Sequence, residues 1–214
     1  MEKSVRLTEI FYSLQGESKT TGLPTVFIRL TGCPLRCQYC DTSYAFTGGE
    51  AKSIADILKT VATYNTQYIT VTGGEPLSQL VCLDLLVQLA DKGYQVSLET
   101  SGAVDISKVD KRITKVMDLK TPASGELSRN LYENLAFLEA KDQLKFVICN
   151  QEDYQWSKQQ IIDYNLVGQC ELLFSPAVGQ QDATELAEWI LRDQLQVRFQ
   201  VQLHKILWGD ATGV

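Results

Sequence analysis

The sequence predicts an α/β fold, specifically a partial, open TIM-like β/α barrel with a mainly parallel sheet. Strand and helix patterns alternate along its 214 residues, which favours right-handed β/α crossovers. Polar and glycine-containing stretches follow the strands, at the ends where barrels of this kind assemble their sites. The chain is short for a complete barrel of about eight units. A hydrophobic content of 44% suits one buried core, so we expect a single domain over residues 1–214.

In the first half of the chain, runs of β-branched and aromatic residues predict strands at 5–12, 25–31, 68–71 and 95–100. Apolar residues recur on one helical face in two intervening segments, 53–64 and 79–92. Ser53 and Ser78 are the expected N-caps of these two helices. Glycines close the strands, so each strand leads directly into a turn.

The alternation continues in the second half of the chain. Strands are predicted at 115–119, 143–149, 170–174 and 195–202. Helices are predicted at 130–140, 153–164 and 182–193, the last with Asp182 as its N-cap.

The charge and the apolar pattern exclude two classes of partner. The net charge is −6 and no basic stripe is present, so we expect no nucleic-acid binding. No apolar run is long enough to cross a bilayer, and residues 1–4 do not begin an apolar signal segment. We therefore expect a cytoplasmic protein that does not associate with a membrane.

Six cysteines in a reducing compartment are more consistent with metal binding or redox chemistry than with disulfides. Three of them stand alone among apolar residues and are expected to be small buried hydrophobes: Cys82, Cys149 and Cys170. The other three are separated by three and then two residues, so their thiolates can converge on one metal centre: Cys33, Cys37 and Cys40.

The donor set of this centre favours an iron–sulfur cluster over zinc. Structural zinc usually takes four protein ligands, and the chain offers no second cysteine pair. The single histidine, His204, is remote in sequence and is expected to be packed and hydrogen-bonded. A 4Fe-4S cluster held by three thiolates leaves one iron open, which implies chemistry at the metal. From spacing alone, zinc binding or chance spacing remains the alternative.

The cysteine triplet, with Tyr39 before its last member, and the turn Gly73-Gly74-Glu75-Pro76 together resemble the radical S-adenosylmethionine superfamily. The resemblance implies a 4Fe-4S cluster whose open iron binds S-adenosylmethionine, and a 5′-deoxyadenosyl radical that takes hydrogen from the substrate. It also implies a set of residues that contact this cofactor: Tyr39, Gly74, Asp118, Lys120 and Ser175. The alternative for Lys120 is a solvated surface lysine.

Further motifs resemble the 7-carboxy-7-deazaguanine synthase family: residues 11–17, Arg29, residues 40–42, 99–102 and 118–120, and the C-terminal segment 203–214. That family converts 6-carboxy-5,6,7,8-tetrahydropterin to 7-carboxy-7-deazaguanine with loss of ammonia, on the route to queuosine and other deazapurines. The resemblance implies Mg²⁺ at Thr42, an electron donor such as a flavodoxin or ferredoxin, and a homodimer. The C-terminal segment is expected to close over the substrate.

The expected substrate contacts match the chemistry of a carboxylated pterin. Gln15 and Glu17 offer hydrogen-bonding groups for an aminopyrimidinone edge, and Arg29 can hold a carboxylate in a bidentate pair. The remaining expected contacts are Leu14, Gly16 and Thr72. One departure concerns Ser18, which stands where the family commonly has glycine and puts the local backbone shape in question.

Each of these roles has a simpler alternative. Gln15 and Glu17 could be solvated in an ordinary turn, and Arg29 could pair with a surface acid. Thr72 could only favour a strand, and Thr42 could only cap a turn after Asp41. Two other functions are compatible with the triplet: a small radical enzyme that activates a protein substrate, and a non-enzymatic iron–sulfur or zinc module.

Overall fold

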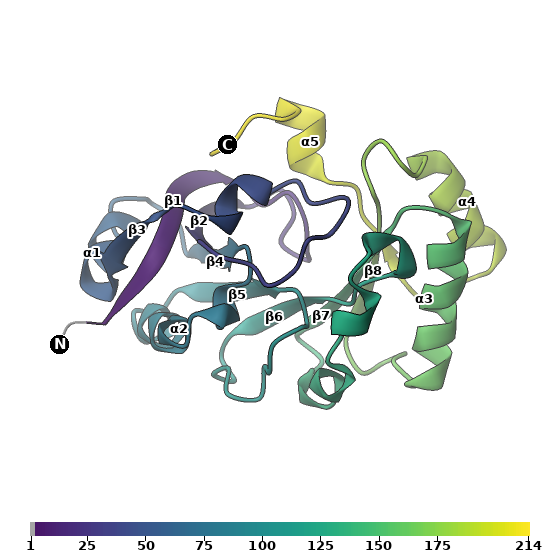
Figure 1. Ribbon diagram of the computed structural model, residues 1–214, viewed down its shortest axis with the longest axis horizontal. Coiled ribbons are helices and arrows are strands. Elements are labelled where there is room, and N and C mark those ends of the chain that lie inside the picture. The colour runs from purple at the N-terminus through teal and green to yellow at the C-terminus, as the bar shows by residue number, and fades with distance from the viewer. Residues whose placement is uncertain (1–2) are drawn as a thin grey trace.

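The computed structural model describes residues 3–214, so Met1 and Glu2 of the N-terminal stretch lie outside the described residues. Within this range nine strands form one sheet in the order β3-β1-β2-β4-β5-β6-β7-β8-β9 (Figure 1). The strands are β1 Ser4–Leu14, β2 Pro24–Leu30, β3 Glu50–Ser53, β4 Tyr68–Gly73, β5 Gln95–Thr100, β6 Thr114–Asp118, β7 Gln143–Ile148, β8 Glu171–Pro176 and β9 Arg198–Phe199.

The sheet is mainly parallel and open, as predicted. From β2 to β9 every neighbouring pair is parallel, and only β1 runs antiparallel to its neighbours β2 and β3. The edge strands β3 and β9 do not pair with each other, so the barrel is not closed. The carboxyl ends of the parallel strands therefore meet along one edge of the sheet.

The helices are α1 Ile54–Val61, α2 Val81–Asp91, α3 Gln151–Asp163, α4 Ala183–Arg192 and α5 Leu203–Trp208, and the 3-10 turns are η1 Ser43–Phe46, η2 Pro76–Ser78, η3 Pro122–Ser124, η4 Leu127–Arg129 and η5 Tyr132–Phe137. Figure 1 shows α1 to α4 around the outside of the sheet and α5 near β1 and β2, beside the C-terminus. Two predicted N-caps are confirmed, because Ser53 accepts a hydrogen bond from the Asp56 amide and Asp182 accepts one from the Glu185 amide. No helix among residues 3–214 combines the length and apolar character that a membrane span needs.

The helix predicted at 130–140 is wrong, because this segment forms only the 3-10 turn η5, at Tyr132–Phe137. The side chain of Asn134 is buried, donates to the carbonyls of Gly102 and Val104, and accepts from the Ile106 amide. These tertiary hydrogen bonds hold the segment against the loop after β5 and override its local helical preference.

The predicted N-cap Ser78 is also wrong. Pro76 starts the turn η2, and Glu75 caps this turn by accepting from the Leu77 amide. The helix α2 then begins after Leu80 without a side-chain cap. A proline fits the first position of a helical turn, where its missing N–H costs nothing.

The end of the chain also differs from the prediction. The strand expected at 195–202 is reduced to β9, and the buried side chain of Gln200 just beyond it bonds the loop after β1. The strand β3 and the helix α5 were not predicted from the sequence. The residues of β3 are mostly polar and pair with β1 at the sheet edge, so they lack the apolar alternation that predicts a strand.

The core lies where the helices pack against the parallel strands. Ile28 on β2, Val71 on β4 and Leu98 on β5 have no exposed surface, as expected for parallel strands that are covered on both faces. The three isolated cysteines are buried as predicted: Cys82, Cys149 and Cys170. This rigid sheet fixes the positions of the side chains at its carboxyl edge.

Candidate active site

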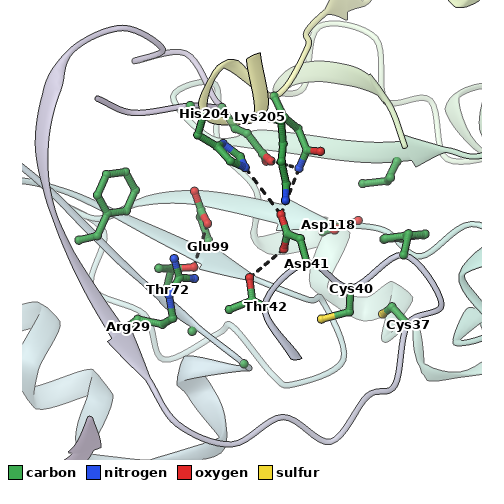
Figure 2. A pocket seen from close by; sticks show the side chains of 18 of the residues that line it. Arg29, Cys37, Cys40, Asp41, Thr42, Thr72, Glu99, Asp118, His204 and Lys205 are labelled. Carbon is green, nitrogen blue, oxygen red and sulfur yellow. Dashed lines mark hydrogen bonds and ion pairs between the residues drawn. The ribbon is translucent and has the colours of Figure 1, made fainter. Parts of the chain in front are cut away.

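A cavity of about 390 Å³ opens at the carboxyl edge of the parallel strands. Nearly every predicted site residue lines it: Leu14, Gln15, Gly16, Glu17, Arg29, Cys33, Cys37, Tyr39, Cys40, Thr42, Thr72, Gly74, Asp118 and Lys120. Figure 2 shows Arg29, Thr72 and Glu99 on one side of this cavity and Cys37 and Cys40 on the other. The fold therefore brings together residues that are far apart in the sequence.

Ser175 is the predicted site residue that the cavity lining does not include. It is buried in β8 and pairs with Val147 of β7, whose side chain does line the cavity. Because paired residues of neighbouring strands point to the same face, Ser175 faces the same side of the sheet as Val147 without lining the cavity. A contact between Ser175 and the cofactor remains a prediction.

The cysteine loop follows β2 directly and is held in shape by Arg36. The Arg36 guanidinium donates to the Cys33 carbonyl at 2.8 Å and lies over the Phe46 ring, 4.3 Å from its centroid. The three thiols are half-buried, and burial raises the pKa of Cys37 to about 11. Burial raises the pKa of Cys33 and Cys40 as well, so without a metal the thiols stay protonated at neutral pH.

The turn after β4 packs tightly against the start of this loop. Gly73 has a φ of +148°, and the amide of Gly74 donates to the Leu30 carbonyl. A Cβ on Gly74 would lie 2.2 Å from the Gly32 carbonyl oxygen and 2.7 Å from the Cys33 Cβ. Only a residue without a side chain therefore lets the β4 turn approach the cysteine loop this closely.

Glu75, which the sequence analysis left without a role, stabilises the same turn. Its carboxylate is fully buried and accepts from the Ser101 amide at 2.7 Å and from the Thr100 hydroxyl at 3.0 Å. The Leu77 amide donates to it at 3.0 Å. Glu75 therefore joins the end of β4 to the end of β5 and supports the cavity floor.

Asp118 and Lys120 form a buried pair at the end of β6. The Lys120 ammonium lies 2.7 Å from Asp118 Oδ2 and over the Tyr39 ring, and Lys120 is only 6% exposed, so the surface-lysine alternative is wrong. Burial opposes its charge, but Asp118 keeps the pKa of Lys120 above its ordinary value. Among the described residues, Asp118 Oδ1 and the Tyr39 hydroxyl are buried without a hydrogen-bond partner.

A row of polar side chains crosses the sheet beside the cavity. Glu9, Arg29 and Thr72 lie in register on β1, β2 and β4. Arg29 Nε donates to Glu9 Oε1 at 2.7 Å, and the Thr72 hydroxyl donates to Glu99 Oε2 at 2.9 Å (Figure 2). Arg29 therefore pairs with an acid, as the simpler alternative supposed, and still lines the cavity.

The loop after β1 is not a solvated turn. Gln15 is 2% exposed, donates from Nε2 to the Thr70 hydroxyl at 3.0 Å and accepts from the Glu17 amide at 3.1 Å. Lys145 lies 2.5 Å from Glu17 Oε2, and Gln202 donates to Glu17 Oε1 at 2.6 Å. Burial works against ionisation of Glu17, yet the Lys145 ammonium holds its pKa below the ordinary value.

Ser18 keeps the backbone shape that a glycine would give. Its φ is +72°, in the left-handed region, and Gln200 bonds both its backbone amide and its backbone carbonyl. The Ser18 amide donates to Gln200 Oε1 at 2.5 Å, and Gln200 Nε2 donates to the Ser18 carbonyl at 2.7 Å. Two good hydrogen bonds compensate for the backbone strain of a left-handed serine.

Asp41 connects the cysteine loop to the C-terminal segment. The Thr42 hydroxyl donates to Asp41 Oδ1 at 2.8 Å, and His204 Nε2 lies 3.7 Å from Asp41 Oδ2 (Figure 2). The His204 ring also packs on Gly16, where a Cβ would come within 2.3 Å of Nδ1. Burial opposes ionisation of Asp41, but His204 and Thr42 hold its pKa below the ordinary value.

Several polar cavity residues were not predicted as substrate or cofactor contacts, among them Glu99, Lys145, Gln202 and His204. Glu99 had a signal, because it lies near the end of a predicted strand and begins the motif at residues 99–102. Lys145 had a weaker one, since it alternates with the buried Leu144 and Phe146 and so points to the opposite face. Gln202 and His204 depend on the path of the C-terminal segment, which no local pattern reveals.

Glu99 should make the stability of the metal-free protein sensitive to pH. Burial, followed by the negative charge of Glu17, raises the pKa of Glu99. At pH values above the ordinary glutamate pKa, the folded state therefore binds more protons than the unfolded state. Stability then falls as the pH rises through this window. We expect Glu99→Gln to be more stable than the wild type at pH 8, with a smaller difference at pH 5. Denaturant unfolding at both pH values measures this, and an equal difference would contradict it.

The comparisons with known proteins agree with this geometry. A family model described as the radical SAM superfamily matches residues 27–119. The chain is 42% identical over 217 aligned positions to the 7-carboxy-7-deazaguanine synthase of Chlorobaculum tepidum, covering 100% of this chain and 99% of that protein. It is 39% identical to the 7-carboxy-7-deazaguanine synthase of Koribacter versatilis, covering 97% of this chain and 99% of that protein.

The chain belongs to the 7-carboxy-7-deazaguanine synthase family. It is therefore an enzyme of the radical S-adenosylmethionine superfamily. The crystal structure of QueE from Escherichia coli has the same fold, with a TM-score of 0.78 and 24% identity over 94% of this chain and 95% of that chain. The two proteins thus share the open, mainly parallel sheet.

The residues at the cavity fit the two groups that a radical S-adenosylmethionine enzyme binds. Three thiols reach one cavity, beside a glycine turn that leaves backbone groups accessible. No three Cys, His, Asp or Glu side chains of residues 3–214 converge on a single-ion site. A 4Fe-4S cluster does not need such convergence, because each thiolate binds a different iron atom. The unpaired Asp118 Oδ1 and Tyr39 hydroxyl leave polar capacity for a polar cofactor.

Proposed function

We propose that this enzyme converts 6-carboxy-5,6,7,8-tetrahydropterin to 7-carboxy-7-deazaguanine with release of ammonia, a step in the synthesis of queuosine or a related 7-deazapurine. The observation that carries the proposal is one cavity with two different walls. The cysteines and Gly74 form the wall that suits a cluster and S-adenosylmethionine, and Arg29, Gln15 and Glu17 form the wall that suits a carboxylated pterin. The names of the near full-length relatives support the same reaction.

On the cofactor wall, Cys33, Cys37 and Cys40 would hold the 4Fe-4S cluster. Gly74, Tyr39, Asp118, Lys120 and Ser175 would hold S-adenosylmethionine. When bound, these two groups supply the abstraction of a hydrogen atom from the substrate. The chain itself orients the reacting groups and excludes water from them, because the cavity lies between the sheet edge and the C-terminal segment.

On the substrate wall, Arg29 would bind the pterin carboxylate through charge-assisted hydrogen bonds. Gln15 and Glu17 would meet the aminopyrimidinone edge, and Leu14, Gly16 and Thr72 would complete the wall. Glu17 is ionised beside Lys145, so it can accept from an amino or ring N–H of the substrate.

We also propose that Mg²⁺ binds at Thr42. Its hydroxyl donates its hydrogen to Asp41, which leaves the oxygen lone pairs available to a hard cation. Mg²⁺ usually keeps water or substrate oxygens among its ligands, so one hydroxyl from the chain is a sufficient anchor beside the substrate.

The proposal includes an electron donor of the flavodoxin or ferredoxin type, because the cluster needs one electron from outside. A single domain, a homodimeric assembly and a cytoplasmic location remain predictions from the sequence.

Turnover under anaerobic conditions tests the proposed function. Protein with a reconstituted cluster receives the carboxylated pterin, S-adenosylmethionine, Mg²⁺ and a chemical reductant, and mass spectrometry follows the deazaguanine product and released ammonia. We expect both products in equal amounts, and a lower rate when Mg²⁺ is omitted. Absence of both products with an intact, reducible cluster would contradict the proposal and favour a different substrate.

A further inference from the structure

The side chain of Arg29 is held from three directions. Its Nε donates to Glu9 Oε1 at 2.7 Å. Its guanidinium lies 5.5 Å from the centroid of the Phe11 ring and 5.7 Å from that of the Tyr44 ring. The Phe11 ring is itself stacked on Phe27, with 4.9 Å between centroids. The position and plane of the guanidinium are thus both restricted.

Tyr44 and Glu9 also hold each other. The Tyr44 hydroxyl donates to Glu9 Oε1 at 2.7 Å, which is the same oxygen that accepts from Arg29. The negative charge of Glu9 contributes to raising the pKa of the Tyr44 hydroxyl to about 12, after the larger effect of burial, so this group remains a donor at neutral pH. One carboxylate oxygen therefore joins the arginine to one of the rings beside it.

This arrangement leaves one edge of Arg29 free. Neither Nη atom has a hydrogen-bond acceptor among residues 3–214, and Arg29 lines the cavity while Glu9 does not. The Nη atoms carry most of the donors that bind a carboxylate. Glu9 thus occupies Nε from behind and leaves the Nη donors for a ligand in the cavity.

The sequence sets up this arrangement through register and chain order. Glu9 pairs directly with Arg29 across β1 and β2, just after an irregularity in the register between Leu7 and Glu9. Tyr44 lies in η1, two residues beyond Thr42, so the segment that carries the last cysteine also delivers the ring. The C-terminal segment passes close by, since a Cβ on Gly213 would lie 3.4 Å from Glu9 Oε2.

We propose that Glu9 and Tyr44 are positioning residues that hold Arg29 ready for the carboxylate of the substrate. This inference rests on the proposed function, because it assigns Glu9 and Tyr44 to the Arg29 contact. An unrestrained arginine would lose rotamer freedom on binding, and fixing it beforehand removes that cost. Glu9 acts only through Arg29, so its effect should depend on the ligand's carboxylate.

Binding measurements without turnover test this inference. The cluster-loaded protein, kept oxidised and anaerobic, is titrated with 6-carboxy-5,6,7,8-tetrahydropterin and with the same tetrahydropterin lacking the carboxylate. The ratio of the two dissociation constants gives the carboxylate preference of the wild type, Glu9→Ala, Glu9→Gln, Tyr44→Phe and Arg29→Ala. Glu171→Ala is the matched control, because Glu171 accepts from Arg198 Nε at 2.5 Å, away from the cavity, and is 23% exposed in its side chain, as Glu9 is.

We expect Glu9→Ala to reduce the carboxylate preference about tenfold, as for loss of a charged hydrogen bond, and Tyr44→Phe to reduce it less. Glu9→Gln should retain part of the preference, since its amide oxygen still accepts from Nε. In an Arg29→Ala background Glu9→Ala should have no further effect, and Glu171→Ala should match the wild type.

Two other outcomes are distinguishable. If Glu9→Ala weakens both ligands equally, or leaves the preference unchanged, the positioning role is wrong while the proposed function stands. If the wild type shows no carboxylate preference, the substrate role of Arg29 in the proposed function is wrong, and the positioning role falls with it.

Discussion

Replacing Gly74 with alanine should reduce turnover by about 100-fold or more, because a displacement of about 1 Å near reacting groups has an effect of that size. The added Cβ would lie 2.2 Å from the Gly32 carbonyl oxygen, 2.6 Å from its carbon and 2.7 Å from the Cys33 Cβ. Backbone cannot rotate away as a flexible side chain does. The cysteine loop must therefore move, and its first thiol moves with it.

The expected loss is specific to the site and not a general cost of removing glycine. Gly93 has a φ of +87° but open space where its Cβ would lie, so Gly93→Ala introduces backbone strain without a clash. We expect Gly93→Ala to lose stability, by about 1 kcal/mol, and to keep normal turnover per cluster. Gly74→Ala should instead bind less iron on reconstitution and less S-adenosylmethionine per cluster. Normal iron content and cofactor binding in Gly74→Ala would contradict this account.

The sequence predicts the part of the site that depends on strand ends. Gly74 and Lys120 follow predicted parallel strands and Asp118 lies near the end of one, and the carboxyl ends of such strands must meet at one edge. The register of the sheet then places them in one cavity. For these residues, the order of the strands and helices along the chain nearly determines which side chains lie close together.

The remainder of the site depends on contacts that no local pattern encodes. Lys145 is 128 residues from Glu17 in the sequence, and no local pattern around either residue predicts their ion pair. Ser175 satisfied the strand-end rule and still does not line the cavity, because the rule does not specify which side chains near a strand end reach the cavity surface. The helix predicted at 130–140 failed similarly, since the buried hydrogen bonds of Asn134 come from a distant loop.

Lys145→Met should destabilise the protein by about 3 to 5 kcal/mol, as expected when one partner of a buried ion pair is removed. The side chains of Lys145 and Glu17 are 14% and 13% exposed, so solvent screens the pair little. Glu99 and Asp118 also lie close enough for the Lys145 charge to act on them. Without this ammonium, Glu17 keeps the hydrogen bond from Gln202 but loses its countercharge.

The pH dependence of the lost stability separates the contribution of the ion pair from that of lost packing. The pKa of Glu17 is lowered in the folded state, so the pair contributes stability above the ordinary value of 4.5, and this contribution disappears as the pH falls below it. The difference between the wild type and Lys145→Met should be full at pH 7 and shrink on acidification. Denaturant unfolding of the metal-free protein measures it, and a difference that stays constant with pH would show that packing dominates.

Two further variants separate the buried ion pair from a general effect of replacing a lysine. Lys59→Met removes a lysine that is 77% exposed and paired with Asp56, and we expect a change below about 0.5 kcal/mol. Glu17→Gln combined with Lys145→Met should recover part of the lost stability, because no unpaired carboxylate then remains at that position. The double variant should nevertheless bind the pterin weakly, since the ionised acceptor is gone. Recovery of stability without recovery of binding would show that this ion pair maintains a charged substrate contact within the buried wall of the cavity.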